Sequence, residues 1–190
     1  MPRGTGSCRS CQTLDAMKLS ADTFTLLGLS VYTAQKVEFG LYGLAAHASH
    51  LPEIRSNKRF AALTPDLFLS KTPGESATFR ATLGELYRIF GERLAISSAE
   101  FDEFLNKRNI VVHSFWREVR DLRGRVGIPQ PDQYLLAFIE LGEKVASTLQ
   151  GLLSLLQEAA AENEGRSNEF VLSDLDVKHR EAYIALARRT

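Results

Sequence analysis

The chain has 190 residues, of which 44% are hydrophobic and 24% charged, a balance typical of one globular domain with a sizeable core. Lysine plus arginine equals aspartate plus glutamate at 23 each, so any affinity for a polyanion has to come from a local patch. No apolar run approaches the ~20 residues that span a bilayer, and no secretory signal opens the chain. We therefore expect a cytoplasmic protein that has no membrane partner.

Residues 1–20 have the composition of a disordered leader. Its two cysteines, Cys8 and Cys11, are spaced Cys-x-x-Cys, but glycine and serine surround them. A structural zinc site needs about four ligands, and the chain has no second cysteine pair. A redox pair needs a strand-to-helix context. We therefore expect no metal site and no cofactor, and Met17 offers an alternative start of translation.

After the leader, apolar side chains recur every three to four positions, which is the spacing of α-helices rather than of strands. The first predicted helix covers 22–50 and ends before a proline. A broken connector with one short helix follows over 52–75. A second helix is predicted over 76–90, where a glycine stops it.

The second half of the chain predicts two longer helices and a short one. The third helix covers 97–122 and begins with a capping box at Ser97. The fourth covers 131–162 and has an apolar face wide enough for a helical bundle. A short C-terminal helix, capped by Ser173 with Asp176, is predicted up to residue 188.

These elements predict an all-α fold, a helical bundle of four main helices plus short extra helices. Long helices joined by short links indicate antiparallel neighbours. The bundle is expected over 21–163, and a loop with the C-terminal helix over 164–190.

The third helix carries the main functional signal. Counted at about 100° per residue, Arg108 lies near the centre of an apolar stripe that a packing helix would fill with leucine. Burying an unpaired guanidinium costs on the order of several kcal/mol, so either Arg108 faces a cleft or a carboxylate compensates it. Glu38, on the buried stripe of the first helix, is the candidate partner. The other stripe members are Phe101, Phe104, Leu105, Val111, Val112, Phe115, Val119 and Leu122.

Polar and aromatic residues lie on the flank beside that stripe. Asn109 and His113 are four apart, as are Trp116 and Arg120, and Arg117 lies four beyond His113. Trp116 is a candidate for stacking on a nucleic-acid base, and packing is its alternative role. Arg117 and Arg120 are candidates for phosphate contacts, with a solvated helix face as the alternative.

The chain has no net charge, but its basic and acidic residues are concentrated in different segments. Between positions 107 and 125 there are six basic and two acidic residues, whereas 130–164 carries one basic and six acidic residues. The basic side therefore coincides with the helix that carries His113.

The three polar residues at the centre of this helix suit one kind of chemistry. His113 can take a proton from a ribose 2′-hydroxyl or give one to a leaving 5′-oxygen. Arg108 supplies permanently charged donors matched to a phosphate, and Asn109 can orient either neighbour. Because the 2′-hydroxyl is the nucleophile, the reaction needs no metal, and it leaves a 2′,3′-cyclic phosphate and a 5′-hydroxyl.

The segment Glu103-Phe-Leu-Asn-Lys-Arg-Asn-Ile-Val-Val-His-Ser-Phe115 resembles the HEPN superfamily (higher eukaryotes and prokaryotes nucleotide-binding). The signature of that family is an arginine, a polar residue, a few further positions and a histidine within a helical bundle. The resemblance covers about residues 22–160 and implies a metal-independent ribonuclease, often of toxin–antitoxin or anti-phage systems and commonly dimeric. It assigns Arg108 and His113 to the catalytic pair and Asn109 to the polar neighbour.

One position departs from the family pattern. HepT-like toxins have a tyrosine two residues after the histidine, where a partner nucleotidyltransferase modifies it, but this chain has Phe115 there. Control by modification at that position is therefore excluded. Of the other histidines, His47 and His50 are expected to offset the dipole at the end of the first helix, and His179 is expected on an exposed, charged helix without a role.

Two functions follow from the sequence. The first is a HEPN-like endoribonuclease that acts on RNA as a homodimer, with an antitoxin or other regulatory partner. The alternative is a non-catalytic dimerisation module, or one that binds a nucleotide or a protein partner, in which Arg108 only anchors an interface.

Overall fold

The structure is a computed structural model that describes residues 20–48, 96–120 and 127–188, together with 52, 56, 88, 90, 91 and 94. The side chains of Ser98 and Arg120 fall outside this description. So do the predicted leader, most of the connector over 52–75 and most of the second predicted helix.

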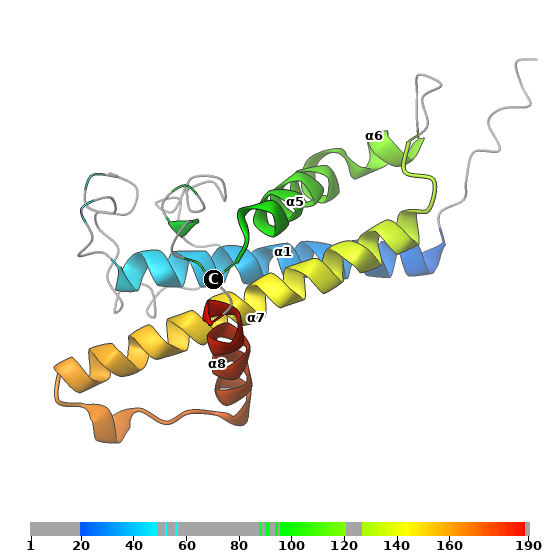
Figure 1. Ribbon diagram of the computed structural model, residues 1–190. Coiled ribbons are helices and arrows are strands. Elements are labelled where there is room, and N and C mark those ends of the chain that lie inside the picture. Colours follow the sequence, from blue (N-terminus) through cyan, green and yellow to red (C-terminus); the bar gives the residue numbers. More distant parts are fainter. Residues whose placement is uncertain are drawn as a thin grey trace, which may run out of the picture.

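The described elements are all helical, so the prediction of an all-α protein is confirmed for this part of the chain (Figure 1). The two longest helices are α1 and α7, and the predicted third helix is divided into three parts. In chain order the elements are α1 (Ala21–His47), α5 (Ser98–Asn109), the π-helix Ile110–Ser114, α6 (Phe115–Arg120), α7 (Pro131–Asn163), a 3-10 turn (Ser167–Glu169) and α8 (Asp174–Ala187).

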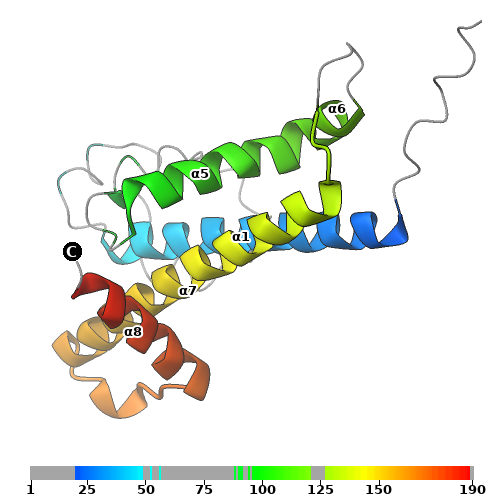
Figure 2. The ribbon, with the colours of Figure 1, turned by 45° about the vertical axis from the view of Figure 1, so that its right-hand side comes forward.

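The helices α1 and α7, which are far apart in sequence, run parallel, whereas α5 and α7, which are joined by a short link, run antiparallel as expected (Figures 1 and 2). Near the starts of both helices, the Thr23 hydroxyl donates to Asp132 Oδ1 at 2.5 Å. Further along both helices, the Thr33 hydroxyl donates to Glu143 Oε1 at 3.2 Å. A Cβ atom added at Gly142 would lie 2.4 Å from Thr33 Cγ2. The two helices therefore approach each other too closely there for any larger residue.

The core lies where α5 covers the pair α1 and α7 (Figure 2). The phenyl rings of Phe104 and Phe138 stack with their centroids 5.3 Å apart. Burial of apolar surface stabilises the fold by roughly 25 cal/mol for each Å² removed from water. Side chains with no exposed surface in this core include Val37, Leu41, Leu44, Phe101, Phe104, Leu135, Phe138 and Leu149.

The predicted third helix is not one continuous α-helix. Its start agrees with the sequence, because the Ser97 hydroxyl accepts the Glu100 N–H at 3.3 Å. After Asn109, however, five residues form a π-helix, whose wider turn holds one extra residue. The register changes there, so Val112 is 38% exposed although the sequence placed it on the buried stripe. Leu122, the last stripe member, lies outside the described residues.

The C-terminal helix α8 crosses α7 (Figure 1). Its boundaries agree with the sequence, and Ser173 and Asp176 form the predicted capping box. A Cβ atom at Gly151 of α7 would lie 2.2 Å from the His179 carbonyl oxygen, so this glycine permits the crossing. None of the helices in the described ranges has the length and apolar character needed to cross a membrane.

Candidate functional site

Arg108 lies in the last turn of α5 and reaches across to α1. Its Nη2 atom is 2.5 Å from Oε1 of Glu38, and the two side chains are 19% and 26% exposed. The ion pair that the sequence left as one of two alternatives is therefore present. It explains why a charge interrupts the apolar stripe, because Glu38 compensates the guanidinium at the edge of the core.

The other terminal nitrogen of Arg108 faces two polar neighbours. Nη1 is 3.2 Å from Nε2 of His113 and 3.3 Å from Oδ1 of Asn109. A guanidinium can only donate hydrogen bonds, so Nε2 of His113 must be the acceptor. This contact is a hydrogen bond only in the tautomer that carries its proton on Nδ1.

The π-helix explains how Arg108 and His113 meet. In a regular α-helix, residues five apart would point about 140° away from each other. The i→i+5 hydrogen bonding of a π-helix instead places residues five apart above one another. The structure thus brings together the predicted catalytic set Arg108, Asn109 and His113, on the partly exposed side of α5. Such π-turns inside α-helices are frequent at functional sites.

The hydrogen bonding of Arg108 is incomplete. Its Nε atom is buried and has no partner in the described part of the chain. A buried donor without an acceptor costs about 1–3 kcal/mol. The position of Arg108 is therefore less favourable for folding than its ion pair with Glu38 alone suggests.

An aromatic pair lies beyond His113. The ring of Trp116 is 41% exposed, and its centroid is 5.5 Å from that of Phe24 on α1, which is 56% exposed. Phe24 was missed in the sequence, because it lies in the first turn of α1, far from the motif. Arg117 is exposed on α6, whereas only the backbone of Arg120 is described.

Of the remaining histidines, His179 differs from its sequence expectation. His179 is half-buried rather than exposed, and burial lowers its pKa below the ordinary value. His47 ends α1 as predicted, and burial also lowers its pKa, opposed by the nearby Glu164 carboxylate. His50 lies outside the described residues. Within the described residues, no three His, Cys, Asp or Glu side chains gather as metal ligands.

Comparison with known proteins was made at three levels. No family model, no curated protein and no solved structure matches this chain.

Proposed function

We propose that the chain is an endoribonuclease that uses Arg108, Asn109 and His113 to cleave RNA through its own 2′-hydroxyl. The observation that carries the proposal is the shared contact of Arg108 Nη1 with His113 and Asn109. It joins a permanent cation and a proton acceptor at one partly exposed place. Phosphodiester cleavage needs both, one for the developing charge and one for the proton.

The reaction balances without another reactant. His113 accepts the proton of the 2′-hydroxyl as the 2′-oxygen forms a bond to phosphorus. The bond between phosphorus and the 5′-oxygen then breaks, and the leaving oxygen takes up a proton from an imidazolium. The products are a 2′,3′-cyclic phosphate and a 5′-hydroxyl, while Arg108 donates to the charged phosphate oxygens.

The geometry of this reaction favours a homodimer. The attacking and leaving oxygens lie on opposite sides of the phosphorus atom, so one imidazole cannot easily serve both. A second copy of the chain would supply a second His113 for the leaving group. Exposed Val112 offers apolar area for such a pairing.

Glu38 and the phosphate of a substrate would compete for the guanidinium of Arg108. Its carboxylate holds Nη2, whereas Nη1 contacts two exposed side chains that can turn toward water. A phosphate that approaches from that side can replace His113 at Nη1, and this frees the lone pair of Nε2 for proton transfer. In this proposal Glu38 orients the guanidinium while the substrate activates the histidine.

The surroundings of the site suit single-stranded RNA. Unpaired bases stack on exposed aromatic rings, and each stacked base contributes about 1–3 kcal/mol. The pair of Trp116 and Phe24 offers such rings next to the motif, and Arg117 offers a cation for the backbone. The side chain of Arg120 is proposed for the same role on sequence grounds alone.

The resemblance to HEPN proteins adds a biological setting to this proposal. It implies a toxin–antitoxin or anti-phage system with a regulatory partner, and we propose the cytoplasm as the compartment. Phe115 is 2% exposed, so the position that carries a modified tyrosine in HepT-like toxins lies in the core here. A regulator would therefore have to act elsewhere, for example by covering Asn109 and His113.

The ion pair favours a second candidate, a non-catalytic module. If Arg108 serves only to neutralise Glu38, the bundle would dimerise, or bind a nucleotide or a partner, without chemistry. The two candidates differ in what happens to RNA.

The decisive experiment incubates the purified protein with a single-stranded RNA in EDTA and with the same RNA carrying one 2′-deoxy ribose at the mapped cleavage position. The proposal expects 2′,3′-cyclic phosphate ends from the first RNA and no cleavage at the deoxy position of the second. Cleavage that persists at the deoxy position contradicts it. An RNA that stays intact at all protein concentrations favours the non-catalytic module.

A further inference from the structure

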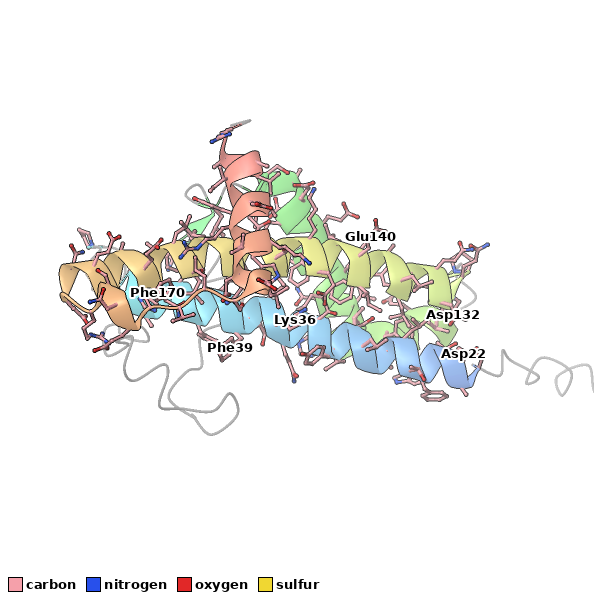
Figure 3. All side chains as sticks on the ribbon, turned by 90° about the horizontal axis from the view of Figure 1, so that it is seen from below. Asp22, Lys36, Phe39, Asp132, Glu140 and Phe170 are labelled. Carbon is pink, nitrogen blue, oxygen red and sulfur yellow. The ribbon has the colours of Figure 1, made fainter. Side chains whose placement is uncertain are left out.

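A hollow of about 700 Å³ lies between α1, α7 and the first half of α8. Its volume is in the range of small-molecule sites, about 300–1,000 Å³. Figure 3 shows Lys36 of α1 close to the place where α8 crosses. The hollow has no part in the proposed ribonuclease site, because none of its lining residues belongs to α5, the π-helix or α6.

The charged groups of the hollow are already engaged. Lys36 Nζ is 2.5 Å from Glu143 Oε2, and the other oxygen of Glu143 accepts the Thr33 hydroxyl. The Asp176 carboxylate accepts both the hydroxyl and the N–H of Ser173. Each of these charged side chains therefore already has a partner within the protein.

Uncharged polar groups are available in the same place. The amides of Gln35 and Gln150 and the hydroxyl of Ser147 line the hollow, and no described residue forms a hydrogen bond with them. An amide both donates and accepts hydrogen bonds, as does a hydroxyl. The ring of His179 also lines the hollow, and its buried Nδ1 has no partner among the described residues.

Aromatic rings complete the lining. Tyr32 and Phe39 of α1, which are 60% and 39% exposed, border the hollow. Tyr32 lies about one turn before Gln35, and the Lys36 Nζ atom lies 5.8 Å from the centre of the Tyr32 ring. A flat ring can therefore lie against the open part of Tyr32 while reaching Gln35. Leu175 of α8, 60% exposed, adds apolar surface on the other side.

We propose that this hollow binds an uncharged heteroaromatic molecule of the nucleobase or nucleoside class, between the amides of Gln35 and Gln150. Such a molecule has a flat apolar face for the aromatic rings and an edge of mixed donors and acceptors for the amides. Phosphorylated forms bind more weakly, because Glu143 and Asp176 repel them and Lys36 is already paired. The ligand connects α1 to α8, which both also pack on α7, so its binding stabilises the docking of α8.

The test measures binding of adenosine, guanosine, uridine and cytidine, each beside its 5′-monophosphate, by calorimetry with the full chain. At least one nucleoside is expected to bind with a dissociation constant below ~1 mM and more tightly than its monophosphate. Gln150→Leu removes the amide at similar volume and should weaken binding about tenfold or more. The matched control is Gln133→Leu, on an exposed part of α7 outside the hollow, which should leave binding unchanged.

A second variant separates binding from folding. Ser147→Phe fills the hollow and should abolish nucleoside binding while circular dichroism shows an unchanged helix content. The proposal is overturned if none of the four nucleosides binds, if the monophosphates bind more tightly, or if both glutamine variants bind alike. RNA cleavage has no part in these readouts, so their outcome is independent of the proposed ribonuclease.

Discussion

Among the described residues, Arg108 and Arg180 each reach from one helix to another. They differ in how many of their hydrogen-bond donors have a partner. Arg180 of α8 is 11% exposed, and all three of its nitrogens donate to α7: Nε to Ser154 Oγ at 3.0 Å, Nη2 to the Ser154 carbonyl at 2.8 Å and Nη1 to Glu158 at 2.7 Å. The Phe170 ring lies 5.6 Å from its guanidinium carbon. Arg108 also has one carboxylate partner, but its Nε has none and its Nη1 contacts two exposed side chains.

The difference separates an arginine that only holds helices together from one that can serve a ligand. A guanidinium whose donors all end on its own protein has nothing to offer a phosphate. In the proposed function, a phosphate replaces the exposed neighbours of Nη1, and water solvates these side chains when they turn away. Partial satisfaction next to a histidine is thus a stronger indication of function than burial of the charge itself.

The largest expected effect is on RNA cleavage. His113→Ala should lower the rate by about 10² or more because proton transfer is lost, and Arg108→Ala by a similar factor because charge stabilisation is lost. Asn109→Ala should cost less, since it orients its neighbours. The control is Arg166→Ala, an exposed arginine paired with Glu164, which should retain full activity. An unchanged rate in His113→Ala would remove the catalytic assignment.

The next effect is on stability at the α7–α8 crossing. Arg180→Leu should lower the free energy of unfolding by ~2–4 kcal/mol, because the buried Ser154 hydroxyl and Glu158 lose their partner. Arg166→Leu is the control, and it should change stability by less than ~1 kcal/mol because its pair is solvent-exposed. Denaturant unfolding followed by circular dichroism measures both. Equal losses in the two variants would show that Arg180 does not anchor α8.

A smaller loss is expected at the α1–α5 contact. Arg108→Leu should cost ~1–2 kcal/mol, because Glu38 is stranded but stays partly hydrated. Glu38→Leu in the same chain should restore that loss, since two apolar residues can then pack across the contact. The double variant of Arg180 and Glu158 should show no such rescue, because Ser154 remains unpaired. If stability were also restored in the double variant of Arg180 and Glu158, the two arginines would have the same structural role.

The smallest effect concerns the aromatic pair next to His113. Trp116 is the single tryptophan of the chain, so its fluorescence reports directly on base stacking. Added single-stranded RNA should quench it even in the inactive His113→Ala variant. Phe24→Ala should weaken that binding about tenfold, whereas Leu29→Ala, another exposed apolar side chain on α1, should leave it unchanged. Binding without quenching would place the RNA elsewhere.

Local signals in the sequence were sufficient to predict where α1 and α7 lie and where α5 and α8 begin. Ser97 and Ser173 marked two helix starts, because a capping hydroxyl acts within three residues of its own position. The proline at the first position of the fourth helix located α7, and the apolar spacing of the first helix located α1, each to within a few residues. The interruption of an apolar stripe by Arg108 also pointed to Glu38 as one of two alternatives, because a carboxylate on a facing helix can compensate a guanidinium there.

The tertiary structure alone decided the arrangement of these helices and the form of the site. The parallel course of α1 and α7 depends on contacts such as Thr23 with Asp132, more than one hundred positions apart, and no local pattern encodes them. No local pattern in the sequence predicted the π-helix that brings His113 to Arg108 either. An α-helical count separates the two side chains, whereas the structure has a π-helix between the buried rings of Phe104 and Phe115.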